Sequence, residues 1–292
     1  MTTDIEDFGK LVASEIISAS RRTDIPAFYM DIVMKAFEEK HIVSTNQFGH
    51  TSNISLDPKH VKCIVWWSKD YHNWLVEYKK NPEIFNQYKH MFNFTITGGD
   101  DLETGLTHSL DERLKQLKEL CEIFGAKTIK YRFDPVVVYM DAKTGERKDN
   151  MKNYKKIIKY VGGCGVKEVI FAFCLPYPKV TARMKKYGKI LLKLSDEEQS
   201  EIINGMITIA NKYGMSLESC CNEDLLHNDE IKPSKCVDGN RIEKILGKKL
   251  KQNKKDKGQR KECNCAISRD IGSYTMKCHH NCEYCYANPA KK

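Results

Sequence analysis

The chain has 292 residues, a formal net charge of +9 and 12 cysteines. This length suffices for one large α/β barrel or two smaller domains, each with a sizeable core. No run of about 18 apolar residues occurs, and the first ten residues, MTTDIEDFGK, are acidic where a signal peptide is basic and then apolar. We therefore expect a soluble, cytoplasmic protein with no membrane partner. Because cytoplasmic thiols are kept reduced, the cysteines favour metal or redox chemistry over a disulfide framework.

Most of the positive charge lies in one short segment. Residues 248–261, KKLKQNKKDKGQRK, carry eight Lys or Arg against the single Asp256, which is seven of the nine net charges. A run of this kind is usually a solvated connector, and less often an arm that contacts phosphates. Nucleic acid is therefore a partner that the charge allows but does not favour.

Taken in chain order, short apolar segments alternate with longer amphipathic ones, which is typical of the βαβ units of a parallel sheet. The expected strands are residues 15–20, 42–45, 63–67, 91–97, 128–133, 168–173 and 216–219. The expected helices are residues 27–39, 71–80, 110–124, 154–161 and 196–213. This order predicts an α/β fold, a (β/α) TIM-like barrel that is complete or partial, with an open doubly wound sheet as the alternative.

The chain is expected to divide into three parts. Residues 1–247 form the barrel domain, residues 248–261 the basic connector, and residues 262–292 a cysteine-rich segment. The last segment is too short to fold without metal or without docking, and we expect it to dock at the barrel mouth.

Polar residues follow several of the expected strands. In parallel α/β folds the loops at the carboxyl ends of the strands carry the chemistry. The candidate catalytic residues at these ends are Arg21, Arg132 and Asp134. Gly98, Gly99 and Asp100 follow the fourth strand, where a glycine pair forms a turn or lets the backbone approach a ligand.

Three closely spaced cysteines lie near the end of the chain, in the stretch KCHHNCEYCY at residues 277–286. Cys278, Cys282 and Cys285 are candidate metal ligands. Zinc is one alternative, with His279 or His280 as the fourth ligand, but structural zinc sites generally use two separated ligand pairs. A compact triad suits one face of a [4Fe–4S] cluster, which takes four ligands. Such a cluster is either closed by a distant ligand or keeps one open iron.

The Cys-x3-Cys-x2-Cys spacing, with Tyr284 just before the last cysteine, resembles the signature of radical S-adenosylmethionine (SAM) enzymes. The tripeptide YCY at 284–286 is similar to that of spore photoproduct lyases within that superfamily. The resemblance implies that the triad holds three irons of a [4Fe–4S] cluster, with Tyr284 at the cofactor site, and that SAM chelates the fourth iron. It also implies cleavage of SAM, after reduction by a one-electron donor such as a flavodoxin or ferredoxin, to a 5′-deoxyadenosyl radical that abstracts hydrogen from a substrate.

The same resemblance gives the glycine pair a function. By analogy with a Gly-Gly-Glu stretch of the superfamily, Gly98 and Gly99 would admit the amino acid moiety of SAM, with Asp100 standing where the superfamily has Glu. Arg21, Arg132 and Asp134 are then candidates for contacts to a carboxylate of SAM or of the substrate.

The motif lies at the opposite end of the chain from its usual place. The superfamily normally has it in the loop after the first strand, whereas here it comes last. Because the first and last strands of a barrel are neighbours, a C-terminal segment docked beside residues 15–20 would reach the same mouth. This arrangement amounts to a circular permutation.

The chain as a whole resembles a bacterial and archaeal family, domain of unknown function 1848. The stretches that carry the resemblance are ISASRRTDIPAFY (17–29), FTITG (94–98), YRFDP (131–135), GQRKECNCAISRDIGSY (258–274) and CHHNCEYCYAN (278–288). They are spread over most of the chain, from residue 17 to residue 288, and support a barrel with a C-terminal cluster.

A second metal site is predicted from the remaining cysteines. Cys263, Cys265, Cys221 and Cys236 lie in loop contexts, whereas Cys63, Cys121 and Cys174 lie in apolar strand or helix contexts and are predicted to belong to the core. These four are candidate ligands of a second iron–sulfur cluster. The alternative to the whole enzymatic interpretation is a zinc-stabilised or closed iron–sulfur module without SAM chemistry, associated with nucleic acid through the basic connector.

Overall fold

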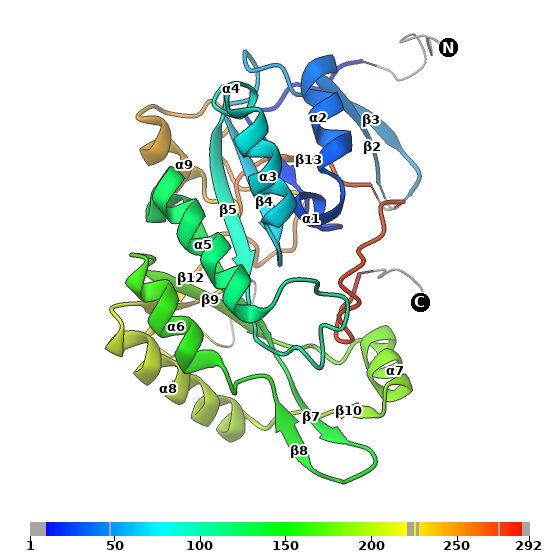
Figure 1. The fold of residues 1–292 in the computed structure, drawn as a ribbon, viewed down its shortest axis with the longest axis vertical. Helices are drawn as coiled ribbons and strands as arrows, with labels where there is room; N and C mark the ends of the chain where they lie inside the picture. Colours follow the sequence, from blue (N-terminus) through cyan, green and yellow to red (C-terminus); the bar gives the residue numbers. More distant parts are fainter. Residues whose placement is uncertain (1–9, 47, 221–224, 226–227, 274, 288–292) are drawn as a thin grey trace. The chain divides into compact units, whose positions relative to one another are not determined.

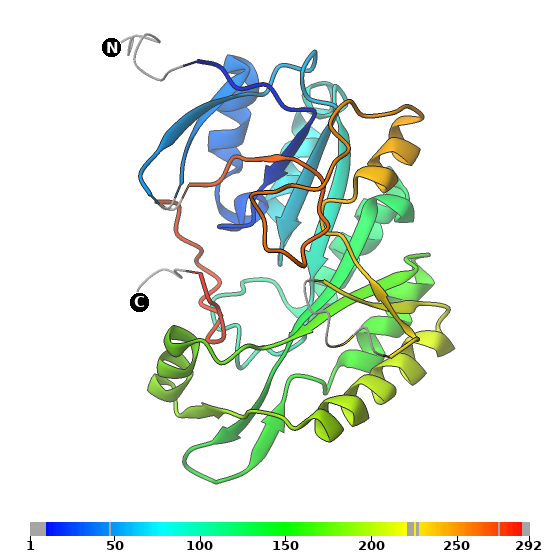
Figure 2. The same cartoon turned by 180° about the vertical axis from the view of Figure 1, so that it is seen from behind.

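The computed structural model describes residues 10–46, 48–220, 225, 228–273 and 275–287, which form two compact units (Figures 1 and 2). Unit 1 comprises Met1–Asn93 and Lys235–Lys277, and unit 2 comprises Phe94–Ser234 and Cys278–Lys292. The chain therefore passes from unit 1 to unit 2 twice, the second time directly before the cysteine triad. The division into 1–247, 248–261 and 262–292 has other bounds and stays a prediction.

Unit 1 contains a parallel sheet. Its strands, in spatial order, are β13 (Arg269–Asp270), β1 (Ile16–Ala19), β4 (Cys63–Ser68) and the first part of β5 (Lys89–Thr95). Ile17 in β1 is in parallel register with Arg269 on one side and with Ile64 on the other. Strands β1 and β4 are buried almost throughout, as expected when both faces of a parallel sheet are covered.

One face of this sheet is covered by helices and the other by a segment without helices. The helices of unit 1 are α1 (Ile25–Phe28), α2 (Met30–Glu39), α3 (His72–Lys80), α4 (Pro82–Phe85) and α9 (Gly239–Leu246). Helices α1, α2 and α3 lie on one face of the strands, and the chain that leads to β13 runs across the other (Figures 1 and 2). The β4–α3–β5 connection is a βαβ unit that the sequence predicts, whereas α1 and α2 after β1 lead into the hairpin β2–β3 before the chain returns to the sheet at β4.

The basic segment 248–261 is folded onto unit 1. Lys255 forms an antiparallel bridge with Ala266. The amide of Asp256 donates to the carbonyl of Cys265 at 2.9 Å, and Leu250 is buried. The lysine side chains face solvent for the most part, but the backbone is paired with the residues that follow.

One expected strand lies outside the parallel sheet. Strand β2 (His41–Thr45) pairs antiparallel with β3 (Thr51–Ser55) in a separate hairpin, so the expectation for 42–45 is wrong about the sheet. Its residues alternate between half-buried and buried, which is the pattern of an antiparallel strand with one covered face. The short connection around Gly49, which has a φ of +81°, allows the hairpin.

Unit 2 contains the rest of the parallel strands. In spatial order they are the end of β5, β6 (Ile129–Val136), β9 (Glu168–Phe173), β11 (Ser216–Ser219) and β12 (Ile231–Pro233). The pairs β6–β9, β9–β11 and β11–β12 are parallel. A small antiparallel sheet accompanies them, in the order β10 (Lys189–Leu191), β7 (Val138–Asp141) and β8 (Arg147–Asp149).

The helices of unit 2 are α5 (Leu110–Phe124), α6 (Tyr154–Gly163), α7 (Pro178–Lys186) and α8 (Asp196–Lys212), with a 3₁₀ turn η2 (Ala126–Thr128). Three of these helices follow the sequence prediction closely, whereas α7 was not predicted. Helices α5 and α8 begin with capping boxes, in which Ser109 pairs with Glu112 and Ser195 with Glu198. Helices α5, α6 and α8 lie on one face of the strands of unit 2 (Figure 1).

The predicted α/β class with parallel strands is confirmed, whereas a complete barrel is not shown. The outermost strands, β13 in unit 1 and β12 in unit 2, each pair with one strand in the described part of the chain. A partial barrel stays a prediction. No helix among the described residues is both long enough and apolar enough to cross a membrane.

Candidate metal centre

The cysteine triad is held by backbone hydrogen bonds to the loop that follows β5. Cys282 forms an antiparallel bridge with Glu103. The amide of Gly105 donates to the carbonyl of His280 at 2.8 Å, and the amide of Glu283 donates to the carbonyl of Leu102 at 2.9 Å. Residues 280–283 are thus added to residues 102–105 like a short strand, which fixes the triad segment on unit 2.

Gly105 makes this close approach possible. A Cβ atom at this position would lie 2.1 Å from the carbonyl oxygen of His279 and 2.7 Å from that of His280. Any other residue would therefore push the triad segment away. On the other side of the contact, Asn281 has a φ of +50°, so the chain turns sharply between Cys278 and Cys282.

Tyr284 connects the triad to a buried carboxylate. Its hydroxyl donates a hydrogen bond to Oε1 of Glu103, and the hydroxyl of Thr97 donates to the same oxygen at 2.7 Å. Glu103 and Tyr284 are 1% and 6% exposed. Burial, followed by the neighbouring Glu103, raises the pKa of Tyr284 well above its ordinary value. The hydroxyl therefore stays protonated and acts as a donor.

Arg113 balances the charge of this loop. It lies on α5, is fully buried, and faces Glu103 Oε2 at 3.9 Å from Nη1 and Asp100 Oδ1 at 3.5 Å from Nη2. Its Nε, Nη1 and Nη2 atoms are buried with no hydrogen-bond partner within the described residues. A buried guanidinium with unused donors is a suitable group for holding an anionic ligand.

The three cysteines of the triad differ in exposure. Cys282 is 5% exposed and packs with Tyr284 in an apolar cluster, while Cys278 and Cys285 are half-buried. Arg183 on α7 donates to the carbonyl oxygen of Cys285. The remaining members of the apolar cluster are Leu102, Val137, Tyr139, Val180 and Met184. The triad segment therefore packs against an apolar cluster, and two of its cysteines are partly exposed.

Cys174 is a residue that the sequence prediction assigned to the core. It follows β9, packs against the apolar cluster of Cys282, and is half-buried. Burial first, then the nearby Asp134 and Cys285, raises the pKa of Cys174 to about 12. A fourth thiol thus lies beside the triad, and it is a potential fourth ligand that the sequence prediction did not include.

The predicted residues Arg132 and Asp134 lie in the same neighbourhood. Both are on β6, and Nη2 of Arg132 donates to Oδ2 of Asp134 in a partly buried ion pair. Asp134 and Cys285 both lie near Cys174, so this ion pair belongs to the surroundings of the triad.

The glycine pair has a clear packing function. Gly98 has a φ of +66°, and a Cβ there would lie 2.9 Å from Cβ of Asn153, whose side chain donates to the Gly98 carbonyl at 3.1 Å. A Cβ on Gly99 would lie 3.0 Å from Cβ of Asn150. Asp100 is exposed, so the buried carboxylate of this loop is Glu103, three residues later. Sequence analysis missed Glu103, although it lies within six residues of the glycine pair.

Arg21 and three of the predicted cysteines lie in unit 1. Arg21 follows β1, and Cys236, Cys263 and Cys265 are all buried. Cys221 lies outside the described residues. Cys263 and Cys265 lie in unit 1 and the triad in unit 2. The expectation that residues 262–292 form one cysteine-rich segment stays a prediction.

Among the described residues, no group of three or more His, Cys, Asp or Glu is arranged to hold a single metal ion. A single ion draws its sulfur ligands to about 2.3 Å from one point. An iron–sulfur cluster instead binds each thiolate through a different iron, so its ligands lie farther apart. The donor set of the triad, three thiols on one short anchored segment, fits such a cluster.

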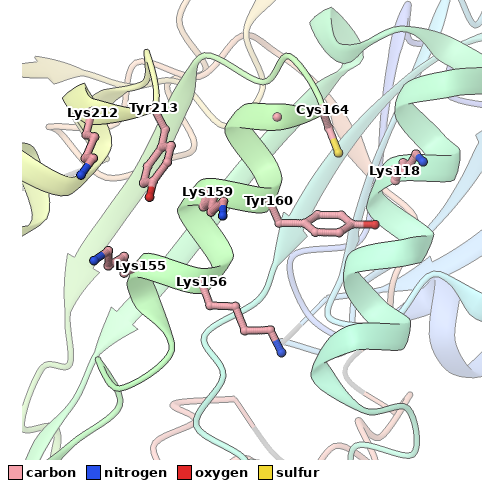
Figure 3. Close-up of a pocket in the computed structure, with 9 residues that line it drawn as sticks. Lys118, Lys155, Lys156, Lys159, Tyr160, Cys164, Lys212 and Tyr213 are labelled. Atoms are coloured by element: carbon pink, nitrogen blue, oxygen red, sulfur yellow. The ribbon is translucent and has the colours of Figure 1, made fainter.

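A separate pocket of unit 2 contains none of the predicted site residues. It has a volume of about 890 Å³ and lies among α5, α6 and the end of α8. Its lining residues are Lys118, Lys155, Lys156, Lys159, Tyr160, Gly163, Cys164, Lys212 and Tyr213 (Figure 3). The five lysines make it a basic surface that is distinct from segment 248–261.

The fold and the anchored cysteine motif define an α/β protein with a C-terminal candidate iron–sulfur site. The family model described as Domain of unknown function (DUF1848) matches residues 16–287, and the chain belongs to this family. No curated protein matches the sequence. Among solved structures, the crystal structure of Streptococcus suis SuiB bound to precursor peptide SuiA is similar over 80% of this chain, with 12% identity and a TM-score of 0.32. The matched part covers 44% of that chain.

Proposed function

We propose that this protein is a radical SAM-type enzyme whose cluster motif lies at the C-terminal end of the chain. Cys278, Cys282 and Cys285 are the proposed ligands of a [4Fe–4S] cluster. The observation that carries the proposal is the pairing of residues 280–283 with residues 102–105, because it places the three thiols beside the buried carboxylate of Glu103. When bound, the cluster and SAM supply a 5′-deoxyadenosyl radical for hydrogen abstraction.

The residues around the triad provide the binding groups that such chemistry needs. Glu103, held by Thr97 and Tyr284, presents a fixed carboxylate suited to an ammonium group. Arg113 has unused buried donors suited to a carboxylate group. An amino acid moiety carries both charges, so the pair matches the polar end of SAM. Gly98, Gly99 and Asp100 stay candidates for the same moiety.

Arg132 and Asp134 are proposed to orient the substrate. Asp134, which is paired with Arg132, lies near Cys174 and Cys285. The electron is proposed to come from a flavodoxin or ferredoxin type of donor.

The test is the formation of 5′-deoxyadenosine. Protein purified and reconstituted with iron and sulfide without oxygen is reduced and incubated with SAM, and the nucleoside is measured by mass spectrometry. We expect release of 5′-deoxyadenosine from the wild type and none from Cys282→Ala. Zinc in place of iron and sulfide, with no nucleoside released, would instead support a zinc-stabilised module without SAM chemistry.

A further inference from the structure

The basic pocket of unit 2, here called the lysine pocket, has no part in the function proposed for the triad. Helix α6 supplies most of its lining, α5 supplies Lys118, and Lys212 and Tyr213 lie at the end of α8 (Figure 3). Its volume of about 890 Å³ is that of a site for a ligand of considerable size. The charges and rings that line it indicate the chemistry of that ligand.

Helix α6 has an exposed face that is entirely basic. Its Ile157 and Val161 are buried, whereas Lys155, Lys156 and Lys159 are exposed, and its sequence YKKIIKYVGG contains no acidic residue. Lys155 and Lys159 are one helical turn apart, so their like charges repel. Lys155 and Lys156 also lie in the first turn, where positive charge opposes the helix dipole. An anion that lies along this face would offset both costs.

Few carboxylates compensate these lysines within the described residues. Lys156 pairs with Asp111 at 2.6 Å and Lys118 with Glu122 at 3.6 Å. All four side chains are more than half exposed, so solvent screens both pairs. The lining lysines that have no ion pair in the described part of the chain are Lys155, Lys159 and Lys212.

Two tyrosine rings lie among these positive charges. Tyr160 on α6 and Tyr213 after α8 are half-buried and line the same pocket. The ring of Tyr160 extends from α6 toward α5 (Figure 3). Among the described residues, neither ring is stacked on another aromatic side chain. Lysines alone attract any polyanion, whereas a basic groove with accessible aromatic rings is typical of sites where unpaired bases stack.

We propose that the lysine pocket binds single-stranded nucleic acid. Its phosphates contact Lys155, Lys159 and Lys212, and its bases stack on Tyr160 and Tyr213. A duplex is a poorer ligand, because its bases are stacked on one another and cannot reach the two rings. The inference does not rest on the function proposed for the triad, since binding of this kind needs neither a cluster nor SAM.

The experiment measures binding of a fluorescently labelled oligothymidine of about 15 nucleotides to the full chain. Fluorescence anisotropy gives the affinity at several salt concentrations, for the single strand and for the same strand paired with its complement. We expect the wild type to bind the single strand more tightly than the duplex. A lysine patch that acts through charge alone would favour the duplex, whose charge density is higher.

Two variants with equal loss of charge test the lysines. The pocket variant combines Lys155→Gln, Lys159→Gln and Lys212→Gln. The control combines three substitutions at exposed lysines elsewhere in unit 2, which are Lys179→Gln, Lys185→Gln and Lys193→Gln. Each phosphate contact to a single strand contributes about 0.7 to the slope of log affinity against log salt. The pocket variant should therefore bind more weakly, with a slope that is smaller by about 2, and the control should keep the wild-type slope.

The tyrosines are tested by Tyr160→Leu combined with Tyr213→Leu, which keeps apolar side chains and changes no charge. We expect the affinity for the single strand to fall at least about tenfold, with the salt slope unchanged and the preference over the duplex lost. Circular dichroism checks that this variant is folded.

Four results would overturn the inference. The first is a wild type that does not bind the single strand at low salt, and the second is one that binds the duplex as tightly. The third is an equal loss of affinity in the pocket variant and in its charge-matched control, which would reduce the effect to net charge. The fourth is a folded tyrosine variant with wild-type affinity, which would leave a surface that attracts phosphate groups alone.

Discussion

The hydroxyl of Tyr284 donates a hydrogen bond to Oε1 of Glu103, and both side chains are buried. This contact joins the residue next to the last cysteine of the triad to the loop after β5. Because a hydrogen bond to a charged group contributes about 2 kcal/mol, Tyr284→Phe should lower the free energy of unfolding by about that amount. Chemical denaturation of both proteins measures the difference. Tyr177→Phe, at a 37% exposed position, is the control and should have no measurable effect.

The approach of the triad segment to Gly105 gives a second prediction. Gly105→Ala places a methyl group on the backbone of His279 and His280, so residues 279–283 must move away. We expect less iron bound after reconstitution and faster proteolytic cleavage near the C-terminus. Gly205→Ala in α8, where a Cβ meets nothing within 4 Å, is the matched control. Equal iron content in the two variants would contradict the close packing of this segment.

His90 in β5 makes stability depend on pH. It accepts a hydrogen bond at Nδ1 from Trp66 and lies 2.9 Å from the carbonyl of Phe85 through Nε2, which is the neutral form. Burial lowers the pKa of His90 to about 4 from an ordinary value of 6.5. The unfolded chain therefore binds more protons between these two values.

Stability is consequently expected to be complete above pH 6.5 and to fall as the pH decreases toward 4. The loss from this residue is about 3 kcal/mol, because one pKa unit corresponds to about 1.4 kcal/mol. Urea unfolding at several pH values measures it. His90→Gln keeps an acceptor for Trp66 and should have a flatter pH dependence, whereas parallel curves would refute the assignment.

The basic segment 248–261 is expected to contribute little to cluster binding. Its lysine side chains are mostly exposed and its backbone is paired with the residues that follow it. Replacing Lys248, Lys249, Lys251, Lys254 and Lys255 by Gln should therefore leave iron content unchanged. Binding of single-stranded DNA is measured at several salt concentrations as well. A loss of salt-dependent binding in this variant, but not in Lys155→Gln with Lys159→Gln and Lys212→Gln, would identify the segment as a phosphate-binding arm.

The repetitive parts of the fold were predictable from the sequence. Helix α5 has apolar residues at helical spacing and a capping box, and its observed bounds are the predicted ones. Strand β2 was placed in the wrong sheet because the four residues 42–45 do not specify a pairing partner. Only the hairpin turn and the register with β3 decide it.

The candidate site was predictable only where it depends on local sequence. The triad has a spacing that the sequence displays directly. Glu103, Arg113 and Cys174 are placed beside it by the pairing of two distant segments, and their local sequence gives no sign of this. Cys174 in particular follows an apolar strand, and only the tertiary structure brings it close to Cys285.

The central claim is that the triad holds a cluster with one iron open to SAM, and Cys174 is the residue that tests it. If Cys174 were the fourth ligand, the cluster would be closed. The most direct measurement is the paramagnetic resonance spectrum of reduced, reconstituted Cys174→Ala protein, recorded with and without SAM. We predict that this variant keeps the signal of the triad cluster and that SAM changes it as in the wild type, while Cys282→Ala loses that signal. A wild-type spectrum that SAM leaves unchanged, together with loss of the triad signal in Cys174→Ala, would contradict the account.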